Sequence, residues 1–99
     1  MNQLKISGKV LNAYTDDYGH FVCTISVVHN HVIDGNDIVT ESIFRACLPD
    51  KDRSAEVDVM PGDRVVIDGY IRQDRRLSAT GKERRSTAIY INDIKLEEP

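Results

Sequence analysis

The chain of 99 residues is 40% hydrophobic and 29% charged, with a formal net charge of −3. A chain of this size buries one modest core, so we expect a single domain over residues 1–99. No apolar run approaches the ~20 residues of a membrane-spanning helix, which excludes such a helix. The N-terminal segment lacks the basic-then-apolar pattern of a secretory signal, so we expect a cytoplasmic protein. Cys23 and Cys47 lie in apolar runs and are expected to be reduced core thiols.

The first half of the chain carries the alternation of apolar and polar residues that is typical of strands. Gly8 lies in the middle of the first run, where a glycine favours a bend. Residues 34–37 favour a tight hairpin turn, because glycine and asparagine tolerate positive φ. Residues 29–33, just before it, either prolong the second strand or leave it. The predicted strands span residues 3–12, 21–28 and 38–48, and one face of the third carries Phe44, Ala46 and Leu48.

The second half adds two more strands and a poor helix. Pro49 ends the third strand, and the acidic segment 50–60 supports at most a short helix that could close the end of a barrel. A Pro-Gly turn precedes the fourth strand, at residues 64–72, in which Gly69 suggests a bulge. The fifth strand spans residues 86–94. The core-facing set of the fourth strand is Val65, Ile67, Gly69 and Ile71, and the opposite set is Arg64, Val66, Asp68, Tyr70 and Arg72.

A cluster of basic residues lies between these two strands, in what we predict to be a long loop over residues 73–86. Five basic residues lie there and Arg72 directly precedes them, so that six basic residues face two acidic ones over residues 72–86, a net charge of +4 that leaves −7 for the rest of the chain. Such a local excess attracts a polyanion, although charges in a loop can also serve solubility alone. The basic residues are Arg72, Arg75, Arg76, Lys82, Arg84 and Arg85.

Five strands, a short helix between the third and the fourth, and glycines in the first and fourth predict an all-β fold, the five-stranded Greek-key barrel called the OB-fold. The chain also resembles the bacterial single-stranded DNA-binding protein family, including its short primosomal replication protein N type. The resemblance rests on residues 6–10 (ISGKV), 61–72 (PGDRVVIDGYIR) and 88–96 (AIYINDIKL). It implies binding of single-stranded DNA, or of RNA, in replication, repair or recombination, with replication proteins as possible partners.

The family resemblance also assigns roles to single residues. The family has an arginine at the end of the third-strand segment that contacts the nucleic-acid backbone, and Arg45 stands at that place. The family stacks bases on tryptophan and phenylalanine, whereas this chain has no Trp and two Phe, with Ile43 near the expected aromatic position. We therefore expect weaker stacking, on Tyr70 and Tyr90, which could equally pack in a subunit interface.

The predicted nucleic-acid site combines Arg45, the two tyrosines and the basic residues between the fourth and fifth strands, with Lys5 and Lys9 as a possible extension. No catalytic motif and no metal-ligand spacing occurs, so we expect neither an enzyme nor a cofactor. The alternative function is a protein-interaction module without nucleic-acid binding. We expect a homodimer or tetramer, because Val22, Val28, Val66 and Tyr70 offer apolar surface to a partner. The predicted site residues are Arg45, Tyr70, Arg72, Arg75, Arg76, Lys82, Arg84, Arg85 and Tyr90.

Overall fold

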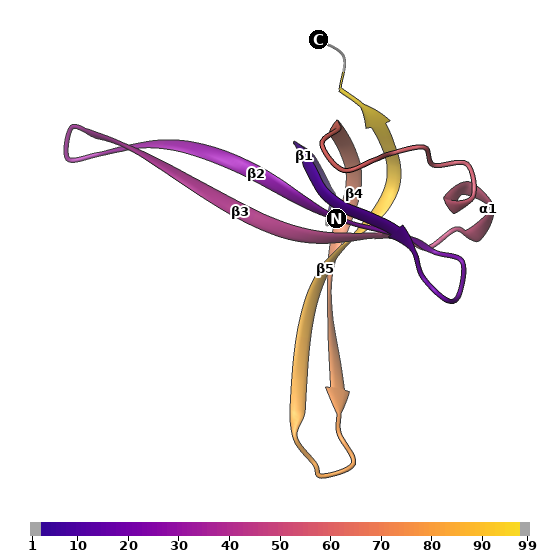
Figure 1. The fold of residues 1–99 in the computed structure, drawn as a ribbon. Coiled ribbons are helices and arrows are strands. Elements are labelled where there is room, and N and C mark those ends of the chain that lie inside the picture. Colours follow the sequence, from indigo (N-terminus) through magenta and orange to yellow (C-terminus); the bar gives the residue numbers. More distant parts are fainter. Residues whose placement is uncertain (1–2, 98–99) are drawn as a thin grey trace.

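Five strands close into a barrel in the computed structural model, which describes residues 3–97 apart from the side chain of Arg76 (Figure 1). The strands follow one another around the barrel in the order β1-β2-β3-β5-β4. This arrangement confirms the predicted all-β OB-fold barrel with a short helix between the third and fourth strands. No helix among the described residues is long and apolar enough to cross a membrane. The elements are β1 (Leu4–Thr15), β2 (Phe21–Ile33), β3 (Asn36–Leu48), α1 (Lys51–Ser54), β4 (Arg64–Leu77) and β5 (Glu83–Leu96).

Strand β1 closes the barrel because it pairs with β4 along its first half and with β2 along its second. It bends at Gly8, where an added Cβ would lie 2.6 Å from the carbonyl oxygen of Ser26. Only glycine permits this close approach of two backbones. On the other side of the barrel, β3 and β5 run parallel and pair only at Ala46↔Ile89 and Cys47↔Tyr90.

The core lies inside the barrel and consists of the inward residues of all five strands. Cys23 belongs to this core, whereas Cys47 points to the opposite face and is half-buried, so the prediction that both cysteines are core residues holds only for Cys23. Burial raises the pKa of the Cys23 thiol to about 11. The core residues are Val10, Phe21, Cys23, Ile25, Ala46, Leu48, Val65, Ile67, Ile89 and Ile91.

The predicted bulge at Gly69 is confirmed. Asp68 pairs with Asp93 and Gly69 with Ile91, so Asn92 is the extra residue, on β5. An added Cβ on Gly69 would lie 2.2 Å from the carbonyl oxygen of Tyr90, which excludes any other residue there. The extra residue reverses the alternation along β5, so that Ile94 packs against the core after Ile91.

Two hairpins extend beyond the barrel as arms, and both are longer than the sequence patterns predict. Pairing of β2 with β3 continues to Ile33↔Asn36, so residues 29–33 prolong the second strand, and Asp34 and Gly35 form the predicted turn with positive φ. Pairing of β4 with β5 continues to Leu77↔Glu83. The prediction of a loop over residues 73–86 is therefore wrong, because cross-strand pairs order all of it except the turn at residues 78–82.

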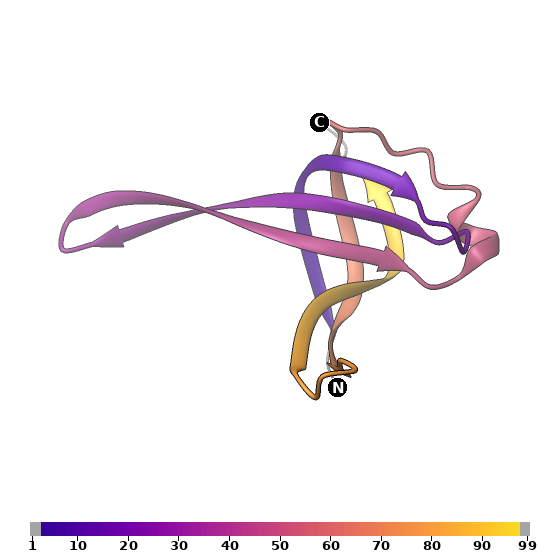
Figure 2. The same ribbon diagram turned by 60° about the horizontal axis from the view of Figure 1, so that its bottom comes forward.

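The two arms point in different directions from the barrel. In Figure 1 the β2–β3 arm extends to the left and the β4–β5 arm extends downward. Figure 2 shows the β2–β3 arm as a ribbon that projects far from the barrel. The end of the barrel near α1 carries neither arm.

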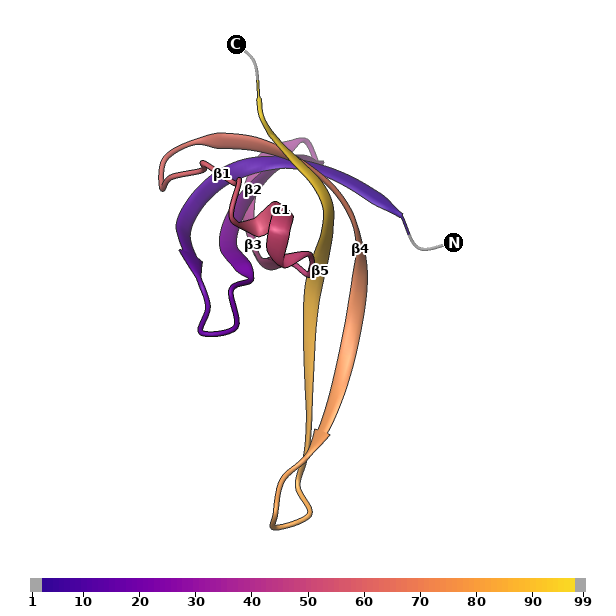
Figure 3. The same ribbon diagram turned by 90° about the vertical axis from the view of Figure 1, so that its right-hand side faces the viewer.

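Helix α1 and the segment after it cover one end of the barrel, as predicted for residues 50–60 (Figure 3). The Asp50 carboxylate caps the helix by accepting hydrogen bonds from the backbone N–H groups of Asp52 and Arg53. Ser54 is buried, and its hydroxyl accepts from the N–H of Phe21 and donates to the carbonyl of Leu48. These two bonds tie the short helix to the ends of β2 and β3.

Candidate nucleic-acid interface

Tyr70 and Tyr90 form one stacked pair on the outer face of β4 and β5. They lie opposite each other in the strand register, and their ring centroids are 5.6 Å apart with an interplanar angle of 15°. The guanidinium carbon of Arg72 lies 5.1 Å from the centroid of the Tyr90 ring. Tyr90 thus contacts two groups, the Tyr70 ring and the Arg72 guanidinium, and both tyrosines are half-buried.

Asp74 fixes this group of side chains, and the sequence patterns gave it no role. Its carboxylate accepts a hydrogen bond of 2.9 Å from Arg72 Nε and another of 3.1 Å from the Tyr90 hydroxyl. The pKa of Tyr90 is raised by burial and by this bond, and the pKa of Arg72 is raised mainly by its bond to Asp74. Asp74 thus orients the platform but neutralises one predicted phosphate contact. The sequence did carry one signal for the contact between Arg72 and Asp74, because two residues that are two positions apart on one strand lie on the same face.

The arginines of the β4–β5 arm divide between the two faces of the ribbon. Arg75 lies opposite Arg85, and Glu83 forms ion pairs with both, at 3.5 Å in the case of Arg85. Lys82 and Arg84 are exposed and form no ion pair among the described side chains. The six predicted cations are therefore not equivalent, because Asp74 and Glu83 form ion pairs with three of them. The Arg76 side chain lies outside the described part of the chain.

Arg45 comes together with the basic arm at the point where β3 and β5 diverge. A cavity of about 370 Å³ there is lined by Arg45, Arg84, Arg85 and Ser86. Three arginines from two strands line this cavity, and a guanidinium group suits a phosphate because it presents a planar fork of N–H donors. The structure thus brings together residues that are 39 to 40 positions apart in the sequence.

A second cavity, of about 240 Å³, shares Arg45 with the first one and is mainly apolar. Its wall combines aromatic and aliphatic side chains, which can contact the flat face of a base or a sugar. The arginine-lined cavity and this apolar cavity together offer the two kinds of contact that one nucleotide requires. The lining residues are Ile43, Phe44, Arg45, Ile71, Thr87, Ala88 and Ile89.

The remaining predictions have mixed outcomes. Lys5 and Lys9 are exposed on β1, which the order of strands separates from β5 by β4, so the structure does not bring them to the arginine cluster. Val22 is buried, which removes it from the apolar surface expected to bind a partner, whereas Val28 is 57% exposed. No group of three potential metal ligands occurs among residues 3–97.

The β2–β3 arm has a different surface. It carries no lysine or arginine between residues 27 and 42, but it carries Asp34, Asp37 and Glu41. His29 and His31 stack with ring centroids 6.0 Å apart, and His31 Nε2 lies 3.0 Å from Thr40 Oγ1. The apolar residues exposed on the arm are Val28, Val32, Ile33, Ile38 and Val39, and Ile43 and Phe44 follow at its base, where they line the apolar cavity.

Comparison with solved structures identifies the architecture. The chain superposes on the Plasmodium falciparum SSB, solved in complex with ssDNA, with a TM-score of 0.71 and 17% identity over 99% of this chain and 96% of that one. The fold is that of single-stranded DNA-binding proteins. A small single-stranded DNA-binding protein from Streptomyces coelicolor matches with a TM-score of 0.62 and 16% identity, over 96% and 93% of the two chains. No family model and no curated protein sequence matches this chain.

Proposed function

We propose that this chain binds single-stranded DNA, without catalysis, along the face where the β4–β5 arm meets β3. The observation that carries the proposal is the cavity lined by Arg45, Arg84 and Arg85, which lies beside a mainly apolar cavity. The SSB structures with the same fold support it, since one of them is a complex with ssDNA. A role in replication, repair or recombination is part of the proposal.

The expected mechanism depends more on charge than on stacking. The three guanidinium groups hold a phosphate, and the neighbouring base lies against the apolar cavity. A further base stacks on Tyr70, which contributes roughly 1–3 kcal/mol. Phosphate contacts do not read sequence, so we expect binding that tolerates any base order and weakens steeply with salt.

Titration of labelled oligo-dT and oligo-U at several salt concentrations tests this function. Four to six phosphate contacts predict a slope of log K against log salt of roughly −3 to −4, at about −0.7 per contact on a single strand. Oligo-U shows whether RNA is bound equally. Affinity for neither oligonucleotide at 50 mM salt would contradict the proposal and favour the protein-interaction module, which the acidic and apolar β2–β3 arm also fits.

Self-association as a homodimer or tetramer is a further part of the proposal. The exposed apolar side chains of the β2–β3 arm, such as Val28 and Val39, offer the surface that a second copy would cover. Sedimentation at micromolar concentration tests it, and a monomer there would contradict it. We place the protein in the cytoplasm, with replication proteins as possible partners.

A further inference from the structure

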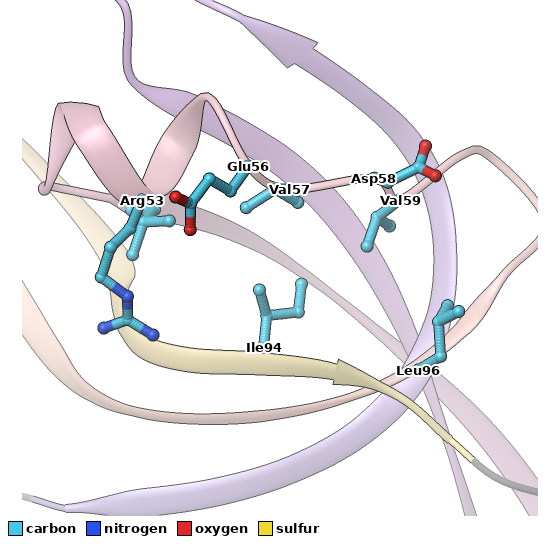
Figure 4. A pocket seen from close by; sticks show the side chains of 8 residues that line it. Arg53, Glu56, Val57, Asp58, Val59, Ile94 and Leu96 are labelled. Atoms are coloured by element: carbon cyan, nitrogen blue, oxygen red, sulfur yellow. The ribbon is translucent and has the colours of Figure 1, made fainter.

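A groove lies between β5 and the segment that follows α1 (Figure 4), and Figure 1 shows that α1 is on the side of the barrel away from both arms. In Figure 4 Val57 and Val59 lie across the hollow from Ile94 and Leu96. The cavity measures about 270 Å³, smaller than the roughly 300–1,000 Å³ of typical small-ligand sites, and suits one or two apolar side chains of a polypeptide. Its lining residues are Leu48, Arg53, Glu56, Val57, Asp58, Val59, Ile94 and Leu96.

One wall of this groove is an edge of β5 that no strand covers. Strand β3 ends at Leu48 and its pairing with β5 stops at Tyr90, so among the described residues the edge beyond Ile91 has no neighbouring strand. On the opposite edge, the N–H of Glu97 donates to the carbonyl of Arg64 at 2.8 Å. Because backbone groups alternate along an antiparallel strand, the N–H and C=O groups of Ile94 and Leu96 turn toward the groove. Such an edge can accept an extended segment as a further strand.

The other wall of the groove is acidic. Glu56 and Asp58 are exposed and form no ion pair among the described side chains. Arg53 is engaged, because its guanidinium donates to the carbonyl of Asn92 and pairs with the Asp93 carboxylate at 3.3 Å. Residues 50–63 carry five acidic and two basic side chains, so the surroundings favour a cationic partner.

We propose that this groove binds an extended, basic segment of a partner protein. The segment pairs its backbone with Ile94 and Leu96, inserts an apolar side chain beside Val57, and sets lysine or arginine side chains against Glu56 and Asp58. Helix α1 and the segment after it, which line the groove, lie away from both arms in Figures 1 and 2, so the segment and a nucleic-acid strand bind at the same time. The face where the β4–β5 arm meets β3 then holds single-stranded DNA, while the groove beside α1 recruits a protein.

Two synthetic eight-residue peptides test this proposal. One alternates valine or leucine with lysine, and its matched control has glutamate in place of every lysine. Nuclear magnetic resonance titration of the ¹⁵N-labelled chain should show that the lysine peptide shifts the amide signals of Val57, Ile94 and Leu96, with cross-strand contacts to β5. The glutamate peptide should bind at least tenfold more weakly, because it repels the acidic wall.

Two variants of the chain sharpen the test. Leu96→Arg, at an exposed position, should weaken the lysine peptide at least tenfold, whereas Leu11→Arg, at an exposed position on β1, should not. The double variant Glu56→Gln with Asp58→Asn should weaken it about fivefold to tenfold, since water and salt screen each exposed ion pair. Oligo-dT affinity should stay within twofold in the groove variants, which separates this proposal from nucleic-acid binding.

Three results would overturn the proposal. The first is equal binding of the lysine and glutamate peptides, and the second is the absence of shifts at Ile94 and Leu96 with millimolar lysine peptide. The third is a homodimer that Leu96→Arg dissociates in sedimentation, since the groove would then be an interface between two copies of this chain. None of these results depends on whether oligo-dT binds.

Discussion

The two arms have the same construction and opposite surfaces. Each is an antiparallel ribbon that extends a pair of barrel strands into solvent (Figure 1). Residues 72–86 of the β4–β5 arm carry a net charge of +4, whereas residues 27–42 of the β2–β3 arm carry three carboxylates and no lysine or arginine. An isolated two-stranded ribbon is marginally stable, so each arm depends on its own cross-strand contacts. The shared architecture provides two projections, and side chains alone decide which of them can bind a polyanion.

The largest expected effect comes from removing the arginine cluster. Arg45→Ala, Arg84→Ala and Arg85→Ala together should weaken oligo-dT binding about a hundredfold at 0.1 M salt and flatten the salt slope by about 2, because each lost contact contributes about 0.7. Fluorescence anisotropy over a salt series measures both quantities. As a control on the other arm, Asp34→Asn with Asp37→Asn and Glu41→Gln should change affinity less than threefold. An unchanged slope in the arginine variant would mean that the cluster is only a solvated surface.

The stacking contribution should be separable from the charge contribution. Tyr70→Ala should weaken oligo-dT binding about tenfold with little change in slope, because one base loses its aromatic contact while every cation stays. Tyr18→Ala is the matched control, since Tyr18 is exposed in the turn between β1 and β2 and should leave affinity unchanged. A change in slope instead of affinity would show that Tyr70 positions a cation rather than a base.

A smaller gain in affinity should follow the release of Arg72. Asp74→Asn keeps an acceptor for the Tyr90 hydroxyl but removes the charge that holds Arg72, so affinity should rise about threefold to fivefold and the slope should steepen by about 0.7. Asp58→Asn removes an equal charge away from the arms and should alter affinity less than twofold. If both variants behave alike, the gain reflects net charge and not the release of one arginine.

The same variant should lower the pKa of Tyr90. Burial and, next, the hydrogen bond to the Asp74 carboxylate disfavour the phenolate in the native protein, so the pKa lies above the usual tyrosine value, and removing the Asp74 charge should move it down. Spectrophotometric titration of tyrosinate absorbance above pH 9 measures this. Because the native state holds the Tyr90 proton more tightly than the unfolded state does, the protonated hydroxyl stabilises the native state at lower pH. This stabilisation is lost as the pH rises through the native pKa. A titration curve identical to that of the parent would show that burial alone sets the value.

The sequence by itself determined the barrel. The signals were the alternation of apolar and polar residues, the positions of Gly8 and Gly69, and the turn at residues 34–37. These signals are local, because backbone sterics and the two-residue period of a strand act over a few residues. Arg45 was assigned through a family resemblance, and the basic character of residues 72–85 was visible as a run of charge. These predictions needed no knowledge of how distant segments meet.

Only the tertiary structure decided how the charges are used. Whether residues 73–86 form a loop or a ribbon depends on pairing across the hairpin, and the cluster of Arg45 with Arg84 depends on where β3 and β5 diverge. The hydrogen bond from the Tyr90 hydroxyl to Asp74 across the β4–β5 pair and the uncovered edge at Ile94 likewise follow from register and strand order. Sequence patterns do not reveal such features, because interactions between charges depend on distances in space. Folding sets these distances between segments that are far apart in the sequence.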